Sequence, residues 1–463
     1  MSATLTNFFY LIASVLFIRG LKGLTHPRTA RRGNVLSATG MLVAIITVLV
    51  GEVGLAWGYI LLGLATGVTV GLWLAYKTKM TAMPQLVALF NGFGGGASLL
   101  VAAAAILIRQ GQEPPMTSGI QALVAASASI VIGSVTFSGS LLAFAKLQGI
   151  YRRTLHFKGL QAANGFLLLS AIACAVLMVR YPDERVWLIL MIAVSGLFGL
   201  LLVAPIGGAD MPVVIAVLNA YSGLAACATG FVLNNTMLII AGSLVGASGM
   251  LLTQVMCKAM NRTFKHVLTG KPMAKSAGRA QEEVYAGKIK SASAAEVAMI
   301  LEAARSVVIA PGFGMAVSQA QFAVRDLVRL LEKRNIEVQF AIHPVAGRMP
   351  GHMNVLLAEA DIAYDKLKDM ESINPSFDQT DVTLVIGAND VVNPDARRTS
   401  DSPIAGMPIL NVDRSKTVVV IKRSLSPGFA GIPNPLFAAD NTVMLFDDGK
   451  AAVNAINAAL KEG

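Results

Sequence analysis

The sequence predicts an α-helical polytopic membrane bundle followed by a C-terminal, Rossmann-like α/β domain with a doubly wound sheet. Two observations predict the bundle. Of the 463 residues, 54% are hydrophobic and only 14% are charged, which is too apolar for an ordinary soluble protein. Apolar runs of about 20 residues, long enough to cross a bilayer, also recur through residues 1–260. The sheet is predicted because short apolar runs alternate with helical patterns after residue 305.

The bundle is expected to contain about nine spans, and these are rich in glycine, alanine and serine. Small residues let helices approach closely where lipid supplies no hydrophobic force between them. The expected limits are 4–21, 35–53, 55–76, 84–108, 119–145, 158–179, 185–204, 211–232 and 236–259. Residues 1–260 are therefore the predicted transmembrane domain.

Basic residues gather in the loops on one side of this predicted bundle. The loops after spans one, three, five and nine hold Arg19, Lys22, Arg28, Arg31, Arg32, Lys77, Lys79, Lys146, Arg152, Arg153, Lys158, Lys258, Arg262 and Lys265. The opposite loops hold only Arg109, Arg180 and Arg185. The positive-inside rule then places the N-terminus outside and the C-terminal domain in the cytoplasm.

The charge and the cysteines exclude two classes of protein. The net charge of +11 does not indicate a nucleic-acid partner, because membrane topology accounts for many of the basic residues. Cys174, Cys227 and Cys257 lie in apolar segments without the spacing of metal ligands. We therefore expect no nucleic acid, no disulfide framework and no metal site.

The polar residues 261–292 are predicted to be a linker, and residues 293–463 are predicted to be a cytoplasmic domain. Ser293 and Glu296 have the spacing of a capping box, which predicts a short helix to about Ala304. The expected strands are 306–311, 336–343, 382–387, 408–412, 417–423 and 442–446, and the expected helices are 315–333, 352–369 and 449–461.

A glycine turn, Gly312-Phe313-Gly314, lies between the first expected strand and a helix. Such a turn can present backbone N–H groups and a helix N-terminus to a pyrophosphate. Gly312 permits the tight turn, and Gly314 is expected to let the backbone approach the phosphate. Val317 stands at the third small position of the usual fingerprint, beside Ala316. A glycine turn without a ligand is the alternative.

The expected strand ends favour NADP(H) over NAD(H). An NAD site usually has an acidic residue at the end of the second strand, but here that strand leads into His343 without an acid. Lys422, Arg423 and Ser424 close another strand at the same edge, and their side chains suit a phosphate monoester. A solvated strand end is the alternative for this basic cluster.

Further loops leave the same edge of the sheet, where ligands bind in such folds. One loop is Gly387–Asp390, and another, Ser426–Gly431, could fold over a ligand as a lid. His343 and His352 flank Arg348, and either histidine could instead be a hydrogen-bonded loop residue.

Long motifs in both parts of the chain resemble one known family. They are Gly312–Val317, His343–Glu359, Val385–Asp390 and Lys422–Ser424 in the C-terminal part, and Gly207–Pro212 and Leu218–Gly223 in the membrane part. These motifs are similar to those of the beta subunit of proton-translocating nicotinamide nucleotide transhydrogenase, and the resemblance covers essentially the whole chain.

The resemblance implies a tightly bound NADP(H), in reversed orientation, whose 2′-phosphate contacts Lys422, Arg423 and Ser424. Hydride would pass between it and NAD(H) on a separate alpha subunit, in a dimer of alpha–beta units in the inner membrane. The residues implied to line or cover the cofactor are Gly312, Phe313, Gly314, Val317, His343, Val345, Ala346, Gly347, Arg348, Met349, Pro350, Gly387, Ala388, Asn389, Asp390, Val391, Gly428 and Phe429.

Neutral polar residues are the candidates for a proton path, because the predicted span cores hold no Asp, Glu, Lys, Arg or His. Asn91 stands where many members of the family have a histidine. Asn91, Asn164, Asn219 and Ser140 are expected at similar depths, given a rise of about 1.5 Å per residue, with Asp210 at the cytoplasmic mouth. The alternative for the polar layer is that its side chains only hydrogen-bond neighbouring helices to one another. The alternative for Asp210 is that it is a helix N-cap.

A transporter or channel regulated by a cytosolic nucleotide-binding domain is the rival function. It predicts a selectivity filter or a substrate site at broken helices, and the sequence has no filter motif such as Thr-Val-Gly-Tyr-Gly.

Overall fold

The computed structural model describes residues 3–24, 27–51, 56–110, 119–151, 153–270, 285, 287–349, 351–398, 402, 404–428 and 430–462. The chain divides into two compact units. The helical unit comprises Met1–Gln254 and Phe264–Lys271, and the sheet unit comprises Val255–Thr263 and Pro272–Gly463.

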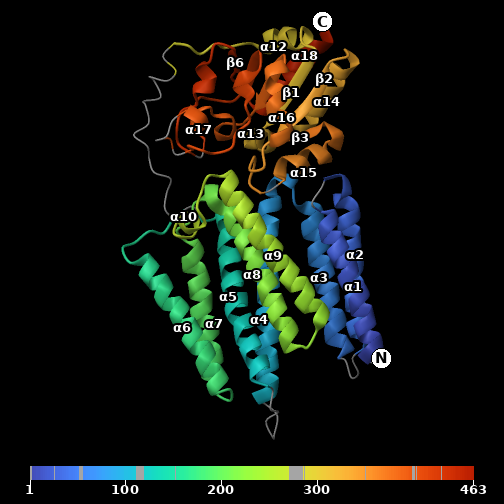
Figure 1. Ribbon diagram of the computed structural model, residues 1–463, viewed down its shortest axis with the longest axis vertical. Coiled ribbons are helices and arrows are strands. Elements are labelled where there is room, and N and C mark those ends of the chain that lie inside the picture. The colour runs from blue at the N-terminus through green and yellow to red at the C-terminus, as the bar shows by residue number, and fades with distance from the viewer. Residues whose placement is uncertain are drawn as a thin grey trace. The chain divides into compact units, whose positions relative to one another are not determined.

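The described residues contain nine helices that are long and apolar enough to cross a membrane (Figure 1). They are α1 (Ala3–Gly23), α2 (Pro27–Gly51), α3 (Trp57–Lys77), α4 (Met83–Gln110), α5 (Ile120–Leu147), α6 (Leu160–Arg180), α7 (Arg185–Val203), α8 (Met211–Val232) and α9 (Thr236–Ala259). The predicted polytopic bundle is confirmed. α2 begins well before the predicted residue 35, and the predicted limits at 53 and 55 lie outside the described residues.

The interior of the helical unit is formed mainly by α4, α5 and α8, which pack on one another. Glycines permit the closest approach: a Cβ at Gly95 of α4 would lie 2.9 Å from the Gly133 carbonyl oxygen of α5. By contrast, no residue of α3 is buried. The glycine cluster of α4 therefore serves helix packing, as small residues do in membranes.

The described residues of the sheet unit form six parallel strands in the order β3-β2-β1-β4-β5-β6. The strands are β1 (Ser306–Pro311), β2 (Glu337–Ile342), β3 (Leu367–Asp369), β4 (Val382–Ile386), β5 (Thr417–Ile421) and β6 (Thr442–Leu445). This order is the doubly wound Rossmann order, so the predicted fold class is confirmed. The strand order reverses between β1 and β4: β2 and β3 follow on one side of β1, whereas β4, β5 and β6 lie on its other side. Ligands bind at such a switch point.

Shorter helices and 3-10 helices occur in both units, and those between β1 and β6 connect the strands. The remaining helices of the described residues are α10 (Phe264–Leu268), α12 (Ala294–Glu302), α13 (Phe313–Ser318), α14 (Gln321–Lys333), α15 (His352–Glu359), α16 (Met370–Ile373), α17 (Asp395–Arg398) and α18 (Gly449–Glu462). The 3-10 helices are η1 (Met80–Ala82), η2 (Gly208–Asp210), η3 (Tyr364–Lys366), η4 (Asn374–Gln379), η5 (Asp390–Val392), η6 (Val412–Arg414) and η7 (Pro435–Ala438). The predicted capping box of α12 is confirmed, because the Ser293 hydroxyl accepts from the Glu296 N–H and the Ser293 N–H donates to the Glu296 carboxylate.

Three of the predicted elements were wrong. The helix expected over 315–333 is two helices, because Gln319 has a φ of +53° and ends α13. The helix expected over 352–369 ends at Glu359, and the chain then forms η3 and β3. Residues 408–412 form no strand: Leu410 is buried in the main core of the sheet unit and Ile409 in a separate cluster of loop residues, which accounts for their apolar character.

The residues just before α12 pack with the sheet. Tyr285 is buried in the core of the sheet unit, and Ser291 forms a parallel bridge with Met444 of β6. The Met444 N–H donates to the Lys290 carbonyl, and the Ala292 N–H donates to the Met444 carbonyl. These contacts place residues 290–292, at the end of the predicted linker 261–292, beside β6 at the edge of the sheet.

Candidate functional site

Two glycine turns meet at the carboxyl ends of β1 and β4, where the strand order reverses. The Gly312 N–H donates to the Ile386 carbonyl and the Gly314 N–H donates to the Gly387 carbonyl, both at 2.9 Å. A Cβ at Gly312 would lie 2.4 Å from the Ala388 backbone nitrogen. Gly387 has a φ of +65°, which favours glycine. Glycine is therefore required here because the two turns pack directly on each other.

Gly314 also lies close to the β4 turn. A Cβ at Gly314 would lie 2.6 Å from the Gly387 Cα. On α13, Ala316 is fully buried and Val317 is 53% exposed. Ala316, not Val317, therefore fills the place of the small residue that packs the helix against the sheet.

The loop after β2 brings Arg348 against the first turn. The Arg348 guanidinium lies 4.5 Å from the centroid of the Phe313 ring, a cation–π contact. The His352 ring lies on the same aromatic side chain, with 6.5 Å between the ring centroids. A flat cationic and aromatic surface thus borders the carboxyl ends of β1 and β2.

His352 holds this loop in place. Its Nδ1 accepts the Arg348 backbone N–H at 3.1 Å, so the neutral ring carries its proton on Nε2. Burial and, to a lesser degree, the Arg348 charge lower the pKa of His352 to about 4. The fully buried Nε2 has no hydrogen-bond partner in the described parts of the chain. Such a donor is costly to leave unpaired.

His343 uses both of its ring nitrogens within the chain. Nε2 lies 2.8 Å from the Pro408 carbonyl oxygen, so it is the donor, and Nδ1 accepts the Val345 N–H at 3.3 Å. Burial lowers the pKa of His343 to about 4, which keeps the ring neutral. The ring of this predicted cofactor-binding residue therefore positions the 343–349 loop.

The three residues of the basic cluster after β5 have different surroundings. The Lys422 ammonium contacts the Ser426 carbonyl and lies 5.1 Å from the Phe437 ring centroid. Burial lowers the pKa of Lys422, and the charge of Asp390 opposes that shift. The exposed Ser424 hydroxyl donates to the Ser426 hydroxyl at 2.9 Å. Arg423 is exposed, and its guanidinium makes no hydrogen bond or ion pair with any residue that the structure describes.

The segment after this cluster lies on the β4 turn. The Asp390 carboxylate accepts the Ala430 N–H at 2.9 Å. A Cβ at Gly428 would lie 2.4 Å from an Asp390 carboxylate oxygen, so glycine permits the contact. The structure thus brings the predicted lid segment, the β4 turn and the basic cluster together. Pro350 and Phe429, two further predicted cofactor-binding residues, lie outside the described residues.

Several predicted cofactor-binding residues are apolar and shape these loops. Val345 and Val391 pack against a buried cluster that includes Ile409, and Ala388 belongs to the main core. Ala346 is buried, and Gly347 has a φ of +110° close to the His352 ring. Met349 is half-buried.

Sequence reasoning missed Tyr285 and Asn434. The Tyr285 hydroxyl accepts the Asn434 N–H at 2.9 Å, and its ring stacks on Phe437. The Asn434 side-chain amide donates to the Asn389 carbonyl at 3.0 Å. The Asn389 side-chain nitrogen is itself buried without a partner among the described residues. No local pattern reveals these bonds, because they join segments far apart in the sequence.

In the helical unit, Asn91 of α4 binds α8. Its side-chain amide donates to the Ile215 carbonyl at 3.3 Å, and its backbone carbonyl accepts the Ser222 hydroxyl at 2.9 Å. Ile215, Asn219 and Ser222 share one face of α8, since they are four and three residues apart. The structure therefore brings Asn91 and Asn219 together, and it adds Ser222, which sequence reasoning missed.

The other predicted polar residues, Ser140, Asn164 and Asp210, lie on α5, on α6 and at the start of α8. Ser140 is fully buried, and its hydroxyl has no partner within the described parts of the helical unit. A Cβ at Gly92, next to Asn91, would lie 3.3 Å from the Ser140 Cβ, so Ser140 belongs with Asn91. Asn164 lies on α6, which packs on α5 and α7. Asp210 occupies the N-cap position of α8, with Pro212 in the first turn, but its side chain makes no capping hydrogen bond.

A second polar group lies further along the same three helices. The Ser129 hydroxyl of α5 lies 2.7 Å from the Thr229 hydroxyl of α8 and within 3.3 Å of the Ser98 carbonyl of α4. Both hydroxyl residues are buried. Sequence reasoning missed this group because hydroxyl residues are frequent throughout the spans.

The chain is similar to known proteins along almost its whole length. The family model described as NAD(P) transhydrogenase beta subunit matches residues 6–459. Two sequences from Rhodospirillum rubrum named NAD(P) transhydrogenase subunit beta are each 46% identical to this chain over 465 aligned residues. Each alignment covers 99% of this chain and 100% of the relative. The chain belongs to the NAD(P) transhydrogenase beta subunit family.

Proposed function

We propose that this chain binds NADP(H) at the carboxyl edge of its sheet and couples hydride exchange with NAD(H) on a separate alpha subunit to proton translocation through its helices. The observation that carries the proposal is Arg423 at the end of β5, which has no partner among the described residues and lies beside the paired turns of β1 and β4. The neighbouring groups support the same cofactor.

The donors at this edge suit a phosphate-rich dinucleotide. Arg423 offers an exposed guanidinium, which is well suited to a phosphate monoester. Lys422 adds a second positive charge next to it. β2 leads directly into His343 rather than into an acid, so nothing at that position selects a ribose 2′-hydroxyl. These features favour NADP(H) over NAD(H).

Two buried donors and one flat surface remain for the rest of the cofactor. The His352 Nε2 and the Asn389 side-chain nitrogen are buried N–H groups that lack an acceptor in the described part of the chain. Phe313 and Arg348 offer an aromatic and cationic surface. The 424–428 segment, held on Asp390, would exclude water. When bound, NADP(H) supplies a nicotinamide that donates or accepts hydride.

Proton movement is proposed to use neutral groups and water. Asn91, Asn219, Ser222 and Ser140 would hold a hydrogen-bonded water chain in the inner half of the bundle, because they gather where α4, α5 and α8 meet. Asp210, at the start of α8, would stand at its cytoplasmic mouth. Asn91 serves here in place of an ionisable carrier.

The remaining parts of the proposal concern location and assembly. Residues 1–260 would cross the inner membrane with the N-terminus outside, and residues 293–463 would bind NADP(H) in the cytoplasm after a linker. The basic loops support this orientation. The alpha subunit would be the partner, in a dimer of alpha–beta units.

Binding of NADPH and NADH to the sheet unit, expressed alone from residue 272, tests the cofactor assignment. Charged hydrogen bonds contribute about 1.5–3 kcal/mol, so Arg423→Ala should weaken NADPH binding roughly 10- to 100-fold and leave NADH binding unchanged. Arg414→Ala is the matched control. Arg414 is exposed before β5, at the opposite edge of the sheet, and pairs with Asp378. Equal NADPH affinities of Arg423→Ala and the unaltered protein would refute the assignment.

A further inference from the structure

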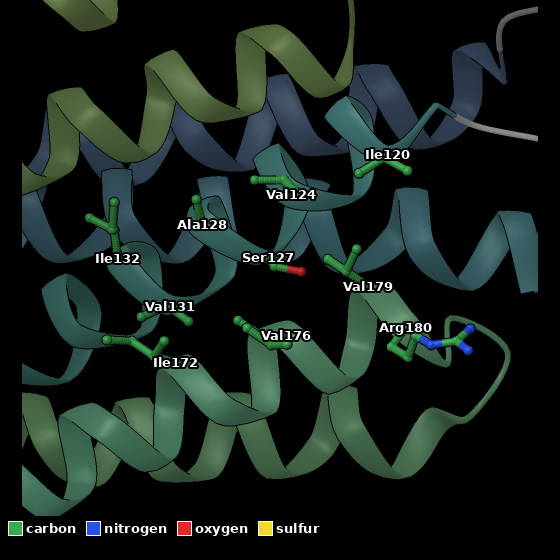
Figure 2. Close-up of a pocket in the computed structure, with 11 residues that line it drawn as sticks. Ile120, Val124, Ser127, Ala128, Val131, Ile132, Ile172, Val176, Val179 and Arg180 are labelled. Carbon is green, nitrogen blue, oxygen red and sulfur yellow. The ribbon is translucent and has the colours of Figure 1, made fainter.

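An apolar groove of about 690 Å³ runs between α5 and α6 in the helical unit (Figure 2). Cys174 and Met178, on another face of α6, pack into a buried cluster with Leu188 and Met191 of α7. The groove is lined by Ile120, Val124, Ser127, Ala128, Val131, Ile132, Ile172, Ala175, Val176, Val179 and Arg180. Both helices are candidate membrane spans, so in a bilayer the surroundings of this groove are lipid.

Ser127 is the one hydroxyl residue among those that line the groove. It is only 2% exposed, and its Oγ has no hydrogen-bond partner within the residues that the structure describes. Figure 2 shows its side chain on the α5 wall, facing α6. A hydroxyl left without an acceptor in apolar surroundings costs free energy. The groove therefore suits an occupant that brings an acceptor oxygen to this depth.

Arg180 is the one charged residue in the lining. It is the last residue of α6, it is exposed, and its guanidinium lies over the Tyr181 ring at 5.6 Å. It makes no hydrogen bond or ion pair in the described ranges of the chain, although Asp183 and Glu184 follow in the next turn. An arginine beside a tyrosine at a helix end is typical of the membrane interface.

The polar groups are spaced along the helix axes. α5 begins at Ile120, at the same end of the bundle at which the antiparallel α6 finishes, so Ser127 lies roughly 10 Å deeper than the α5 start at 1.5 Å per residue. From the interface inward, the groove thus presents a cation, then a hydroxyl donor, then hydrocarbon walls.

The geometry points to a binding site for a glycerophospholipid. Its phosphate contacts Arg180, an ester carbonyl accepts the Ser127 hydroxyl, and one acyl chain lies along Val131, Ile172 and Val176. The volume of the groove lies within the range of about 300–1,000 Å³ of small-ligand sites. It therefore suits a lipid chain better than a partner helix, which is about 10–12 Å across. The backbone carbonyls of a helix are also already bonded, while a lipid ester carbonyl is a free acceptor.

Photo-crosslinking tests this site on the full chain, together with any subunit that copurifies, in bilayer nanodiscs. The probe is a phosphatidylcholine with a diazirine midway along one acyl chain. Peptide mapping should find labels on 124–132 and 172–179 several-fold above those on the α7 segment 186–197. Uniform labelling of all lipid-facing segments, or no label in the groove because another polypeptide covers it, would overturn the site.

Two variants sharpen the test. Arg180→Gln should lower labelling by the phospholipid probe roughly tenfold, the equivalent of one charged hydrogen bond, but not labelling by a diacylglycerol probe with the same chain. Equal losses with both probes would overturn the phosphate contact. Ala128→Phe with Ala175→Phe should fill the groove and abolish its labels, whereas Ala193→Phe, on an exposed position of α7, should not. If the double variant does not insert, the Arg180→Gln comparison decides alone.

Discussion

The two buried histidines should make the stability of the sheet unit depend on pH between 7 and 5. His343 and His352 are the two histidines in the sequence after residue 272. Burial lowers the pKa of each to about 4, whereas a histidine in the unfolded chain has a pKa of about 6.5. Because the folded pKa is the lower one, the stabilisation is fully present above about pH 6.5 and is lost as the pH falls toward 4.

Proton linkage gives the size of the effect. Between pH 7 and 5, each histidine should lower the free energy of unfolding by about 2 kcal/mol, and the pair by about 4 kcal/mol. Carboxylates contribute little in this range. The pKa of Asp381, for example, is lowered to about 2, principally by a hydrogen bond from Lys416, so its stabilisation is lost only below about pH 4.

Urea unfolding of the sheet unit, expressed alone from residue 272, measures this loss at constant ionic strength. His343→Asn keeps a donor for the Pro408 carbonyl but removes the titrating group, so it should roughly halve the pH dependence. His352→Asn should do the same. A free energy of unfolding that is equal at pH 7 and pH 5, or a dependence that both variants retain in full, would refute the reasoning.

Three further predictions follow from the turns, the polar layer and the basic loops. Gly387→Ala should destabilise the sheet unit by about 2–5 kcal/mol in urea unfolding, because it adds left-handed strain and a clash with Gly314; a loss below 1 kcal/mol would contradict the packing of the two turns. Asn91→Leu and Asn219→Leu should each abolish proton pumping in membrane vesicles and leave NADPH binding to the sheet unit unchanged, and pumping that survives in both would make these residues packing groups. A reporter fused after residue 463 should be active only in the cytoplasm, and activity on the outer face would overturn the orientation.

The sequence predicts well those features that depend on local patterns of residues. Apolar length reveals the spans, and apolar runs that end in glycine or in charge reveal where strands stop. Pro311-Gly312, Ile386-Gly387 and Ile421-Lys422 each mark the carboxyl end of a strand in the structure. Because parallel strands share one carboxyl edge, the positions of these strand ends in the sequence are enough to locate the candidate site.

The features that the sequence does not reveal depend on distant partners. β3 has only three residues, Leu367–Asp369, and its pairing with β2 defines it. Residues 408–412 resemble a strand because they are apolar, but they are buried as a loop that packs on the main core and on a neighbouring loop cluster. The bond of His343 to Pro408 spans 65 residues, and that of Asn91 to Ile215 spans 124. Such bonds decide which polar groups remain available for a ligand.

Coupled turnover directly tests whether this chain links hydride exchange to proton movement. The full chain and its alpha subunit, in sealed vesicles, should reduce an NAD analogue with NADPH while an internal pH indicator reports proton movement. Both signals should require both subunits, and an imposed proton gradient of the same sign should slow hydride transfer. Hydride transfer that proceeds at one rate with or without a gradient, and with no change in internal pH, would contradict this link.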